Sequence, residues 1–504
     1  MDSDHEKALN IAFIHPDLGI GGAERLVVDA AIGLQECGHK VTIYTSHCDK
    51  THCFEEVKNE DLKVVVLGEF LPTNFMGKFF ILFANLKQFI LVLNLVMTGA
   101  VNKYDLFIVD QLPTCVPFLH FFGRYARTLF YCHFPDQLLA QKVVLLKRLY
   151  RIPFDLLEQF TMAASDLVVV NSNFTKSIFF KTFRYLRMNP NVVYPCVELA
   201  SSPICDNDIA LYDQIIGPGD RYYLSLNRFE RKKDVMLAIE AYSMSNQSKN
   251  KNSKLLICGG YDERVHENVE YLKELQKACE DLNLSHATIF YKYFSSDSGG
   301  YQVPKGLKFK RVIFMTSISS SLKELLLQRT EMLLYTPSFE HFGIVPLEAM
   351  KNGIPVLAVN NGGPVETVVS LEPGVNDKMA TGWLRPQDAR QWADVLDESV
   401  VYTSENTDVF SNNGPERIRE HFSRDAMTES FLLNIENMFM KERRIQYWAV
   451  ITTMGFNTAL HLLVHSFGSS YSFLYILIAS TFLLRSNFAL GLYWILAFFL
   501  QGFL

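Results

Sequence analysis

The sequence predicts an α/β protein built from two doubly wound, Rossmann-like domains that face a cleft. Short apolar runs alternate with helical patterns over the first 440 residues, and the 504-residue chain is longer than one core usually spans. The apolar runs are continuous, which is typical of parallel strands covered on both faces. A polar segment near residue 205 breaks the series, so we expect domains at 1–205 and 206–440.

The first domain opens with a predicted β-α-β unit. A short β-rich run at 11–15 leads into a glycine loop, and a helical pattern then extends to Gly38, a typical residue for a helix C-terminus. The second strand of the unit is "KVTIYTS". Further strands of this domain are expected at "KVVVLG", "DLFIVD", "TLFYCHF", "DLVVVNS" and "NVVYP".

The second domain repeats this alternation. Its predicted strands are "YYLSLNRF", "KLLICGG", "RVIFMTSI", "EMLLYTPS" and "PVLAVN", with helical patterns between them, and a loop insertion is expected at 295–306. In doubly wound sheets, ligands bind at the carboxyl ends of the strands, where the strand order reverses. Functional side chains are therefore sought directly after these strands.

The C-terminal residues predict a membrane-anchoring tail over 441–504. Residues 445–504 hold one charged residue, Arg485, and Tyr447–Phe467 is an uncharged run of 21 residues. A spanning helix needs ~20 apolar residues. Tyr471–Leu500 fits one long tilted helix or a re-entrant pair, and buried core helices are the alternative. The basic tetrad 441–444 predicts a cytosolic position for the preceding residues.

A third apolar run, Phe79–Met97, is ambiguous. It contains Asn85, Lys87, Gln88 and Asn94, which lie near one another on a helical wheel. This pattern favours an amphipathic helix lying on a membrane or on the core over a spanning helix.

Charge and cysteine usage exclude some classes of function. The net charge of −6 gives no reason to expect nucleic acid as a partner. The nine cysteines include no CxxC pair and lie beside apolar residues, which indicates buried free thiols in a reducing compartment. The run "HCDKTHC" matches no standard zinc-finger spacing, so a zinc site is disfavoured there.

The stretch "SFEHFGIVPLEAM" carries the strongest chemical signal. Glu340 follows a predicted strand, Gly343 allows a sharp turn, and Glu348 is expected in the first turn of the next helix. Two carboxylates suit the hydroxyl groups of a sugar and a ribose, and free helix N–H groups suit a phosphate. The alternative is that Glu348 caps its helix and Glu340 faces solvent.

Four further strand ends carry candidate residues. Arg228 and Lys233 follow a strand, with Lys233 at an exposed helix start, and both suit a leaving diphosphate, although ordinary surface charge is the alternative. Glycine at two strand-to-helix turns lets the backbone approach a ligand closely. The first of these turns does not have the GxGxxG pattern of dinucleotide-binding proteins, so a dinucleotide dehydrogenase is disfavoured. His133 suits a donor sugar or an acceptor, and is equally consistent with a core histidine. The two glycine turns hold Gly21 and Gly22, and Gly362 and Gly363.

Together these motifs resemble the family-4 glycosyltransferases of GT-B architecture over about residues 10–440. The family signature E-x7-E is present as Glu340 and Glu348, and "PLEAM" and "GGPVE" also match. Longer stretches such as "CHFPDQLLAQ" are similar to the fungal α-1,3/α-1,6-mannosyltransferases of dolichol-linked oligosaccharide synthesis. His341 and Asn227 stand where many relatives have glycine.

The resemblance implies a retaining transfer of mannose from GDP-mannose to a dolichyl-diphosphate-linked oligosaccharide. The second and third mannoses would be added, in α-1,3 and then α-1,6 linkage, at the cytosolic face of the endoplasmic reticulum membrane. No cofactor or obligatory metal is expected, and other early-pathway transferases are candidate partners. Two alternatives stay open: an N-acetylglucosaminyltransferase acting on phosphatidylinositol, and a non-catalytic scaffold that binds nucleotide sugars.

The resemblance also implies roles for single residues. Glu340 would contact the donor sugar, Glu348 the ribose, and Arg228 with Lys233 the diphosphate. Catalytic roles fall to Glu340, His133 and Lys233. The donor site would hold Gly21, Gly22, Arg228, Lys233, Glu340, Phe342, Gly343 and Glu348.

Overall fold

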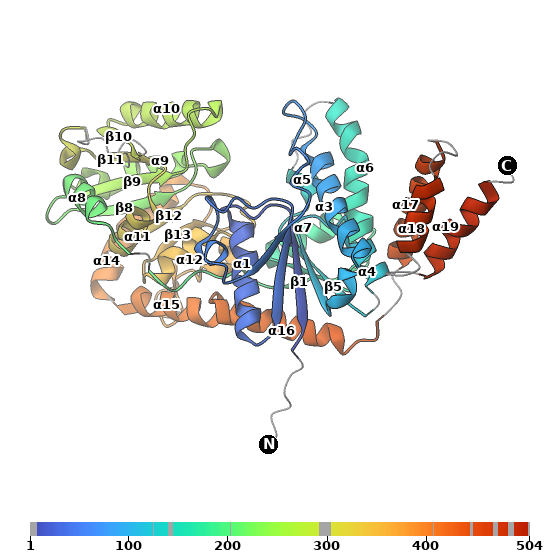
Figure 1. Ribbon diagram of the computed structural model, residues 1–504. Coiled ribbons are helices and arrows are strands. Elements are labelled where there is room, and N and C mark those ends of the chain that lie inside the picture. Colours follow the sequence, from blue (N-terminus) through green and yellow to red (C-terminus); the bar gives the residue numbers. More distant parts are fainter. Residues whose placement is uncertain are drawn as a thin grey trace, which may run out of the picture. The chain divides into compact units, whose positions relative to one another are not determined.

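The computed structural model describes residues 8–123, 125–139, 145–201, 203–291, 304–406, 408–443, 447–466, 472–481 and 488–501. The chain forms two compact units (Figure 1). Unit 1 contains residues up to Tyr194 and from Met427 onward, and unit 2 contains Pro195–Ala426. The division into domains at 205 and 440 stays a prediction, as does the position of the loop insertion at 295–306, most of which lies outside the described residues.

Unit 1 is built on a sheet of seven parallel strands in the order β3-β2-β1-β4-β5-β6-β7. The continuous apolar strands expected from the sequence are present; β4 and β5, for example, are buried along their whole length. The strands are β1 (Asn10–His15), β2 (Lys40–Thr45), β3 (Lys63–Val66), β4 (Leu106–Asp110), β5 (Arg127–Cys132), β6 (Leu167–Val170) and β7 (Asn191–Val192).

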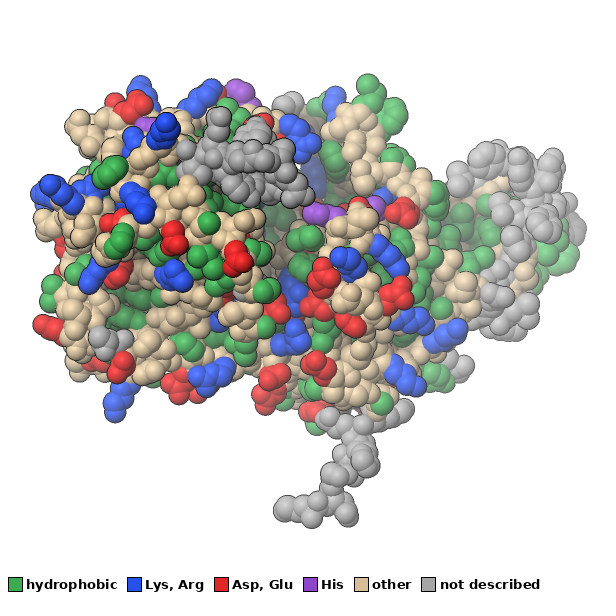
Figure 2. All heavy atoms as spheres, turned by 60° about the vertical axis from the view of Figure 1, so that its left-hand side comes forward, with side chains coloured by type: hydrophobic (Ala, Val, Ile, Leu, Met, Phe, Trp, Pro, Cys, Tyr) green, Lys and Arg blue, Asp and Glu red, His purple; other side chains and the backbone are tan. Residues whose placement is uncertain are grey.

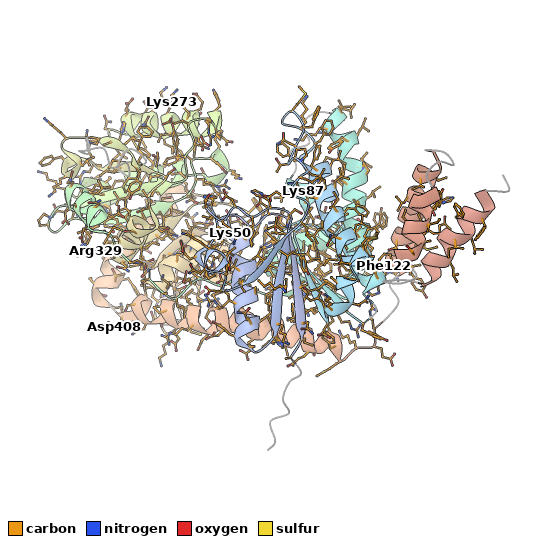
Figure 3. The ribbon with its side chains drawn as sticks, in the orientation of Figure 1. Lys50, Lys87, Phe122, Lys273, Arg329 and Asp408 are labelled. Carbon is orange, nitrogen blue, oxygen red and sulfur yellow. The ribbon has the colours of Figure 1, made fainter. Side chains whose placement is uncertain are left out.

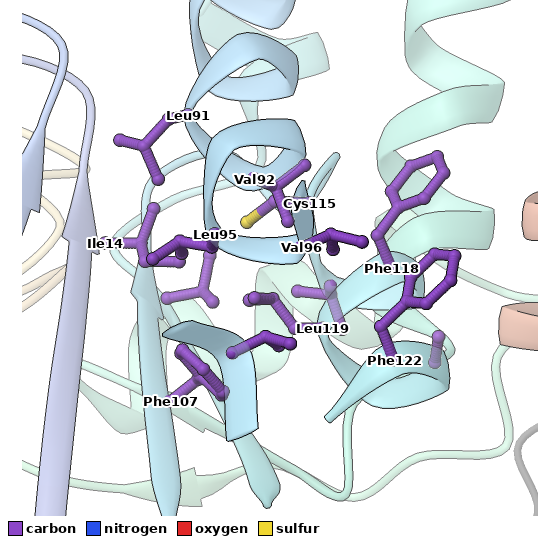
Figure 4. Close-up of a cluster of buried hydrophobic side chains, with 14 of the residues drawn as sticks. Ile14, Leu91, Val92, Leu95, Val96, Phe107, Cys115, Phe118, Leu119 and Phe122 are labelled. Carbon is purple, nitrogen blue, oxygen red and sulfur yellow. The ribbon is translucent and has the colours of Figure 1, made fainter. Parts of the chain in front are cut away.

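Helices cover both faces of this sheet (Figure 1). They are α1 (Gly22–Glu36), α2 (Glu55–Lys58), α3 (Phe80–Met97), η1 (Ala100–Lys103), α4 (Val116–Phe122), α5 (Asp136–Leu139), α6 (Leu145–Met162) and α7 (Asn173–Thr182). Helix α16 (Arg424–Phe439) carries the chain from unit 2 back to unit 1. Apolar side chains of α3 and α4 pack on those of β1 and β4 to form a core, shown in Figure 4.

Three of the four polar side chains named for helix α3 are buried, and the fourth, Asn94, is exposed. Asn85 and Gln88 are buried, and Gln88 donates a hydrogen bond to the Leu112 carbonyl at 2.6 Å. Lys87, also buried, is labelled in Figure 3. Some apolar side chains of α3 are exposed, such as Phe80 at 56% and Leu86 at 40%, whereas Leu91, Val92, Leu95 and Val96 are buried in the core. Among the described residues, α3 is the one helix long and apolar enough to cross a membrane, and 39% of it is buried.

Three helices follow in the C-terminal part: α17 (Tyr447–Ser466), α18 (Ser472–Thr481) and α19 (Phe488–Gln501). Helices α18 and α19 lie side by side, because the ring centroids of Tyr475 and Trp494 are 5.3 Å apart. Of the two alternatives for Tyr471–Leu500, the paired arrangement is present, although Tyr471 and the "RSN" break lie outside the described residues. Whether this part enters a membrane stays a prediction.

Unit 2 is built on a second sheet of seven parallel strands, in the order β10-β11-β9-β8-β12-β13-β14. Its strands are β8 (Arg221–Leu226), β9 (Ser253–Gly259), β10 (His286–Phe290), β11 (Val312–Thr316), β12 (Met332–Tyr335), β13 (Val356–Val359) and β14 (Gly382–Arg385). Its helices are α8 (Asp206–Ile215), η2 (Arg231–Lys233), α9 (Met236–Met244), η3 (Asn246–Lys249), α10 (His266–Asp281), η5 (Leu307–Phe309), α11 (Ser320–Arg329), α12 (Ile344–Lys351), α13 (Pro364–Thr367), α14 (Ala389–Glu405) and α15 (Asp408–His421).

Each sheet has one point where the strand order reverses. In unit 1 this point lies between β1 and β4, and in unit 2 between β8 and β12. Loops after these strands diverge there and leave room for a ligand. The topology therefore selects the residues that follow β1 and β4, and those that follow β8 and β12, as candidates for function.

The cysteine prediction is right in one respect and wrong in another. All nine cysteines are free, as expected. Five are buried, but Cys37 and Cys205 are exposed, and Cys48 and Cys53 are half-buried, because they lie in surface loops or at helix ends rather than in strands.

On the face shown in Figure 2, basic and acidic side chains are interspersed, without a large field of one sign.

Candidate functional site

In unit 2, Lys233 and Glu340 form an ion pair at the point where the strand order reverses. Lys233 ends η2 after β8, Glu340 lies in the loop after β12, and the ammonium group contacts Oε2 of the carboxylate. The Thr336 hydroxyl donates to the Lys233 carbonyl at 2.7 Å, which fastens η2 to the end of β12. The expectation of an exposed Lys233 is wrong, because its side chain is only 14% exposed.

The loop that carries Glu340 is held in shape by glycine contacts. Gly343 has φ +83°, and a Cβ added there would lie 3.2 Å from the Tyr335 ring. A Cβ on Gly363 would collide with the Phe342 backbone, and the Gly363 N–H donates to the Glu340 carbonyl at 2.7 Å. The Phe342 ring is buried and supports the loop through packing.

Glu348 lies one turn deeper than expected. It is the fifth residue of α12 and so belongs to the second turn, because the helix begins at Ile344, directly after Gly343. Its carboxylate pairs with Lys323 of α11 at 2.8 Å. The alternative that Glu348 caps its helix is therefore excluded.

Tyr335, the last residue of β12, feels the charge of both carboxylates. Its side chain is buried, and burial together with the charge and hydrogen bond of Glu340, and the charge of Glu348, raises its pKa well above the usual value. The hydroxyl therefore stays protonated at neutral pH and remains a donor to Glu340.

Arg228 stands apart from this pair. Its side chain is 59% exposed, and its guanidinium lies 2.8 Å from Glu230, which also pairs with Lys232 at 3.1 Å. The structure thus brings Lys233 and Glu340 together, while Arg228 is held on the neighbouring loop.

In unit 1, three polar side chains meet at the corresponding edge of the sheet. His15 ends β1, Asp110 ends β4, and His133 follows β5 directly. Asp110 Oδ2 lies 2.7 Å from His15 Nδ1, and Asp110 Oδ1 lies 2.6 Å from His133 Nε2. Because β1, β4 and β5 are neighbours in the sheet, their carboxyl ends place these groups side by side.

The charges in this cluster are mutually stabilised. Burial alone would lower the pKa of His15, but hydrogen bonds and charges from Asp110 and Glu24 outweigh it and raise that pKa to about 9. Burial would raise the pKa of Asp110, but its close contacts with His133 and His15 lower that pKa to about 2. His15 is therefore a cation and Asp110 an anion at neutral pH.

The glycine turn of unit 1 lies beside this cluster. Gly21 is the N-cap of α1, and a side chain there would meet the Glu24 carboxylate. A Cβ on Gly22 would meet nothing within 4 Å, so the chain itself leaves open space at this position. Glu24 Oε1 lies 3.6 Å from His15 Nε2, which joins the turn to the histidine.

Several residues of these clusters were not predicted from the sequence, among them His15, Asp110, Lys323 and Tyr335. His15 and Asp110 are polar residues that end apolar strands, a signal that could have drawn attention to them. Lys323 and Tyr335 carry no such local signal, because their roles depend on contacts across elements. Among the described residues, no group of three His, Cys, Asp or Glu side chains is arranged for a metal ion, and the need for a metal stays untested.

Models of two glycosyltransferase families match the chain. The model of Glycosyltransferase Family 4 matches residues 20–201, and that of Glycosyl transferases group 1 matches 212–299 and 305–417. The first match contains Asp110 and His133 of the histidine–aspartate cluster and begins just after His15, and the second contains the Lys233–Glu340 pair.

Curated relatives are similar over nearly the whole chain. The α-1,3/1,6-mannosyltransferase ALG2 of Eremothecium gossypii is 61% identical over 98% of this chain and 96% of its own length. The enzyme of the same name from Saccharomyces cerevisiae is 55% identical over 97% of each chain. The chain belongs to the ALG2 family of α-1,3/1,6-mannosyltransferases. As a member of this family it is a glycosyltransferase, and the resemblance seen in the sequence is confirmed.

Solved structures give the fold of this ALG2-family chain. Anabaena HepE, solved in complex with UDP and glucose, has a TM-score of 0.57 and 18% identity, covering 85% of this chain and 100% of its own. The catalytic domain of starch synthase IV from Arabidopsis thaliana, bound to ADP and acarbose, has a TM-score of 0.61 and 13% identity, covering 86% of this chain and 100% of its own. The predicted GT-B fold is thereby confirmed.

Proposed function

We propose that this chain transfers mannose from GDP-mannose to a dolichyl-diphosphate-linked oligosaccharide. It adds the second and third mannoses, in α-1,3 and then α-1,6 linkage, with retention of configuration. The observation that carries the proposal is the Lys233–Glu340 pair at the strand-order reversal of unit 2, in a chain of the ALG2 family.

The donor is proposed to bind by exchanging ion-pair partners. Without a ligand, Lys233 is neutralised by Glu340. A diphosphate carries more charge than one carboxylate and would take over Lys233, with Arg228 closing from its loop. Glu340 would then be free to accept hydrogen bonds from the mannose hydroxyls, while Tyr335 keeps its carboxylate oriented.

Helix α12 is proposed to supply the remaining contacts to the donor. The helix begins after Gly343, so its first backbone N–H groups have no partner within the helix and favour a phosphate. Glu348, held by Lys323, is proposed to accept the ribose hydroxyls. When the bond to mannose breaks, Lys233 and these N–H groups stabilise the charge that grows on the diphosphate. No side chain is assigned as a nucleophile, and no metal is proposed.

The lipid acceptor requires contact with a membrane, and unit 1 carries an apolar surface suited to it. Phe79, just before α3, lies 5.5 Å from Tyr150 of α6, measured between ring centroids, so these helices are neighbours. Phe70, Phe75, Met76, Phe80, Leu145, Leu146 and Leu149 are exposed around them. We propose that this surface rests on the cytosolic face of the endoplasmic reticulum membrane, with residues 441–504 as an anchor.

Purified full-length protein with a synthetic lipid-diphosphate acceptor carrying one mannose tests this proposal. Separate reactions receive GDP-mannose or UDP-N-acetylglucosamine, and a third receives phosphatidylinositol as acceptor. The proposal predicts sugar transfer from GDP-mannose alone, to the lipid-diphosphate acceptor alone. Transfer from UDP-N-acetylglucosamine to phosphatidylinositol would overturn it, and donor binding without transfer to any acceptor would favour the scaffold.

A further inference from the structure

The cluster of His15, Asp110 and His133 takes no part in the donor contacts proposed above. We propose that Asp110 is a positioning residue that holds His133 with its hydrogen on Nε2, so that Nδ1 accepts a hydrogen bond from a sugar hydroxyl. The proposal rests on the proposed function, because the sugar is its ligand. It adds Asp110 and His15 as residues that prepare His133 for that contact.

The tautomer of His133 follows from the chemistry of its partner. Asp110 is only 1% exposed and contacts an imidazole through each of its two oxygens. An ionised carboxylate accepts hydrogen bonds and cannot donate them. A ring nitrogen 2.6 Å from such an oxygen must carry a hydrogen, since two lone pairs at that distance would repel. The hydrogen of a neutral His133 therefore lies on Nε2, and Nδ1 is the acceptor.

His15 keeps Asp110 in its ionised form. The His15 side chain is fully buried and has a carboxylate on each side, Asp110 at 2.7 Å and Glu24 at 3.6 Å. A buried imidazole between two carboxylates is stabilised as a cation. Its positive charge in turn makes protonation of Asp110 unfavourable, so Asp110 stays a pure acceptor toward His133.

The orientation of His133 leaves part of its ring available. Nε2 is buried and lies 2.6 Å from Asp110 Oδ1, a close polar contact whose angles fall outside those of a formed hydrogen bond, whereas 21% of the side chain is exposed. The Tyr131 ring packs against it, with centroids 4.8 Å apart at 52°, and the Tyr131 hydroxyl is fixed to the Val193 carbonyl at 2.8 Å. Asp110 thus lies against one edge of the imidazole, and Tyr131 packs against one face. These contacts fix the orientation of the ring, as is required of a group that accepts a hydrogen bond from a sugar hydroxyl in one direction.

The competing explanation is that Asp110 only stabilises the fold. The same sheet contains a buried aspartate with such a structural role. Asp166 precedes β6 at the opposite edge of the strands and is also buried, 3.6 Å from His120 and 3.6 Å from Arg127. It accepts a hydrogen bond from the Thr128 N–H at 2.8 Å, which joins β5 and β6. Asp166→Asn is therefore a matched control: it alters a buried carboxylate beside a histidine, far from the carboxyl ends of the strands.

A double-mutant cycle on the full-length protein tests the proposal. Asp110→Asn and His133→Ala are measured singly and together for kcat and KM in mannose transfer, and for GDP affinity. We expect each single change to lower kcat by roughly ten- to a hundred-fold. The double variant should be no slower than His133→Ala, and GDP affinity should stay unchanged because GDP is assigned to unit 2. Asp166→Asn combined with His133→Ala should give independent effects.

If the losses of kcat in Asp110→Asn and His133→Ala multiply in the double variant, the proposal is overturned. Full activity of Asp110→Asn would overturn it as well. If Asp110→Asn does not fold, ring ¹⁵N resonances of the wild-type protein decide the matter, with His133 assigned by its absence in His133→Ala. A neutral His133 with its hydrogen on Nε2 supports the proposal, and one with its hydrogen on Nδ1 overturns it. Wild-type protein that transfers no mannose would instead refute the proposed function, which the resonances do not test.

Discussion

Lys233 and Glu340 contact each other across the strand-order reversal of unit 2, although 106 residues separate them in the chain. The pair joins Lys233, which is proposed to bind phosphate, to Glu340, which is proposed to bind the sugar. Its two members can be separated by experiment, because each is proposed to take a different part of the donor.

Lys233→Ala is expected to remove most of the transfer activity. A charge-assisted contact to the leaving diphosphate contributes ~1.5–3 kcal/mol, or roughly ten- to a hundred-fold in rate. Lys232→Ala is the matched control, because Lys232 is 67% exposed and pairs with Glu230. Steady-state rates of both variants check this. Equal activity of the two would remove Lys233 from the site.

The two glutamates are expected to differ in what they bind. Glu348→Gln should weaken GDP binding, since the ribose loses its acceptor, whereas Glu340→Gln should leave GDP affinity nearly unchanged and lower kcat. Calorimetric titration of GDP into both variants, with rate measurements alongside, distinguishes them. The opposite pattern would mean that the roles are exchanged.

Gly343→Ala should destabilise unit 2 and lower activity. Alanine at φ +83° is strained by roughly 1–2 kcal/mol, and its Cβ would crowd the Tyr335 ring at 3.2 Å. Gly374→Ala is the matched control, because Gly374 has φ +77° with nothing within 4 Å of an added Cβ. We expect a lower Tm in both variants and lost activity only in Gly343→Ala. Lost activity in both would assign the effect to general instability.

The His15 cation predicts a pH dependence of stability. Its pKa is raised from 6.5 to about 9 in the folded protein, so its contribution is complete below pH 6.5 and is lost as the pH rises through 9. Tm should therefore fall between pH 7 and 10, and fall less steeply in His15→Gln. Parallel melting curves of the two proteins over this range would contradict the assignment.

Three acceptor patterns for N-glycosylation test the cytosolic position. They begin at Asn173, Asn246 and Asn283, and all three asparagines are exposed on the folded units. Burial therefore cannot explain an absence of sugar. We expect no endoglycosidase-sensitive shift in the native protein, and degradation of both units by protease added outside sealed microsomes. Sugar on Asn173 would place the units in the lumen.

The sequence predicted most strands, because buried parallel strands leave a strong signal in continuous apolar runs. It missed β10 and β14, which lie at the two edges of the sheet in unit 2 and are only partly buried. It also predicted that Glu340 lies in a loop after a strand, since the glycine and proline that follow mark the turn. Glu348 was placed one turn too early, because the first residues of α12 are apolar and do not mark its start. His15, Asp110 and Lys323 were missed because their partners lie far away in the chain, and only the strand order brings them together.

The polar stripe of α3 shows a related limit. Asn85, Lys87 and Gln88 form one face in the sequence pattern, but a helical wheel does not say which face meets the protein. In the structure these three residues are buried, and the Thr114 hydroxyl donates a hydrogen bond to the Asn85 side chain, whereas Asn94 is exposed. Apolar residues of the C-terminal half of α3, such as Leu91 and Leu95, are buried in the core as well. Tertiary contacts with the loop before α4 decide the orientation.

Analysis of the product made by the purified protein tests the central claim most directly. The protein is incubated with GDP-mannose and the lipid-diphosphate acceptor carrying one mannose, and the released oligosaccharide is digested with linkage-specific mannosidases. We predict a product with three mannoses, one added in α-1,3 and one in α-1,6 linkage, and its absence with Glu340→Gln. An unextended acceptor, or equal product from Glu340→Gln, would contradict the account.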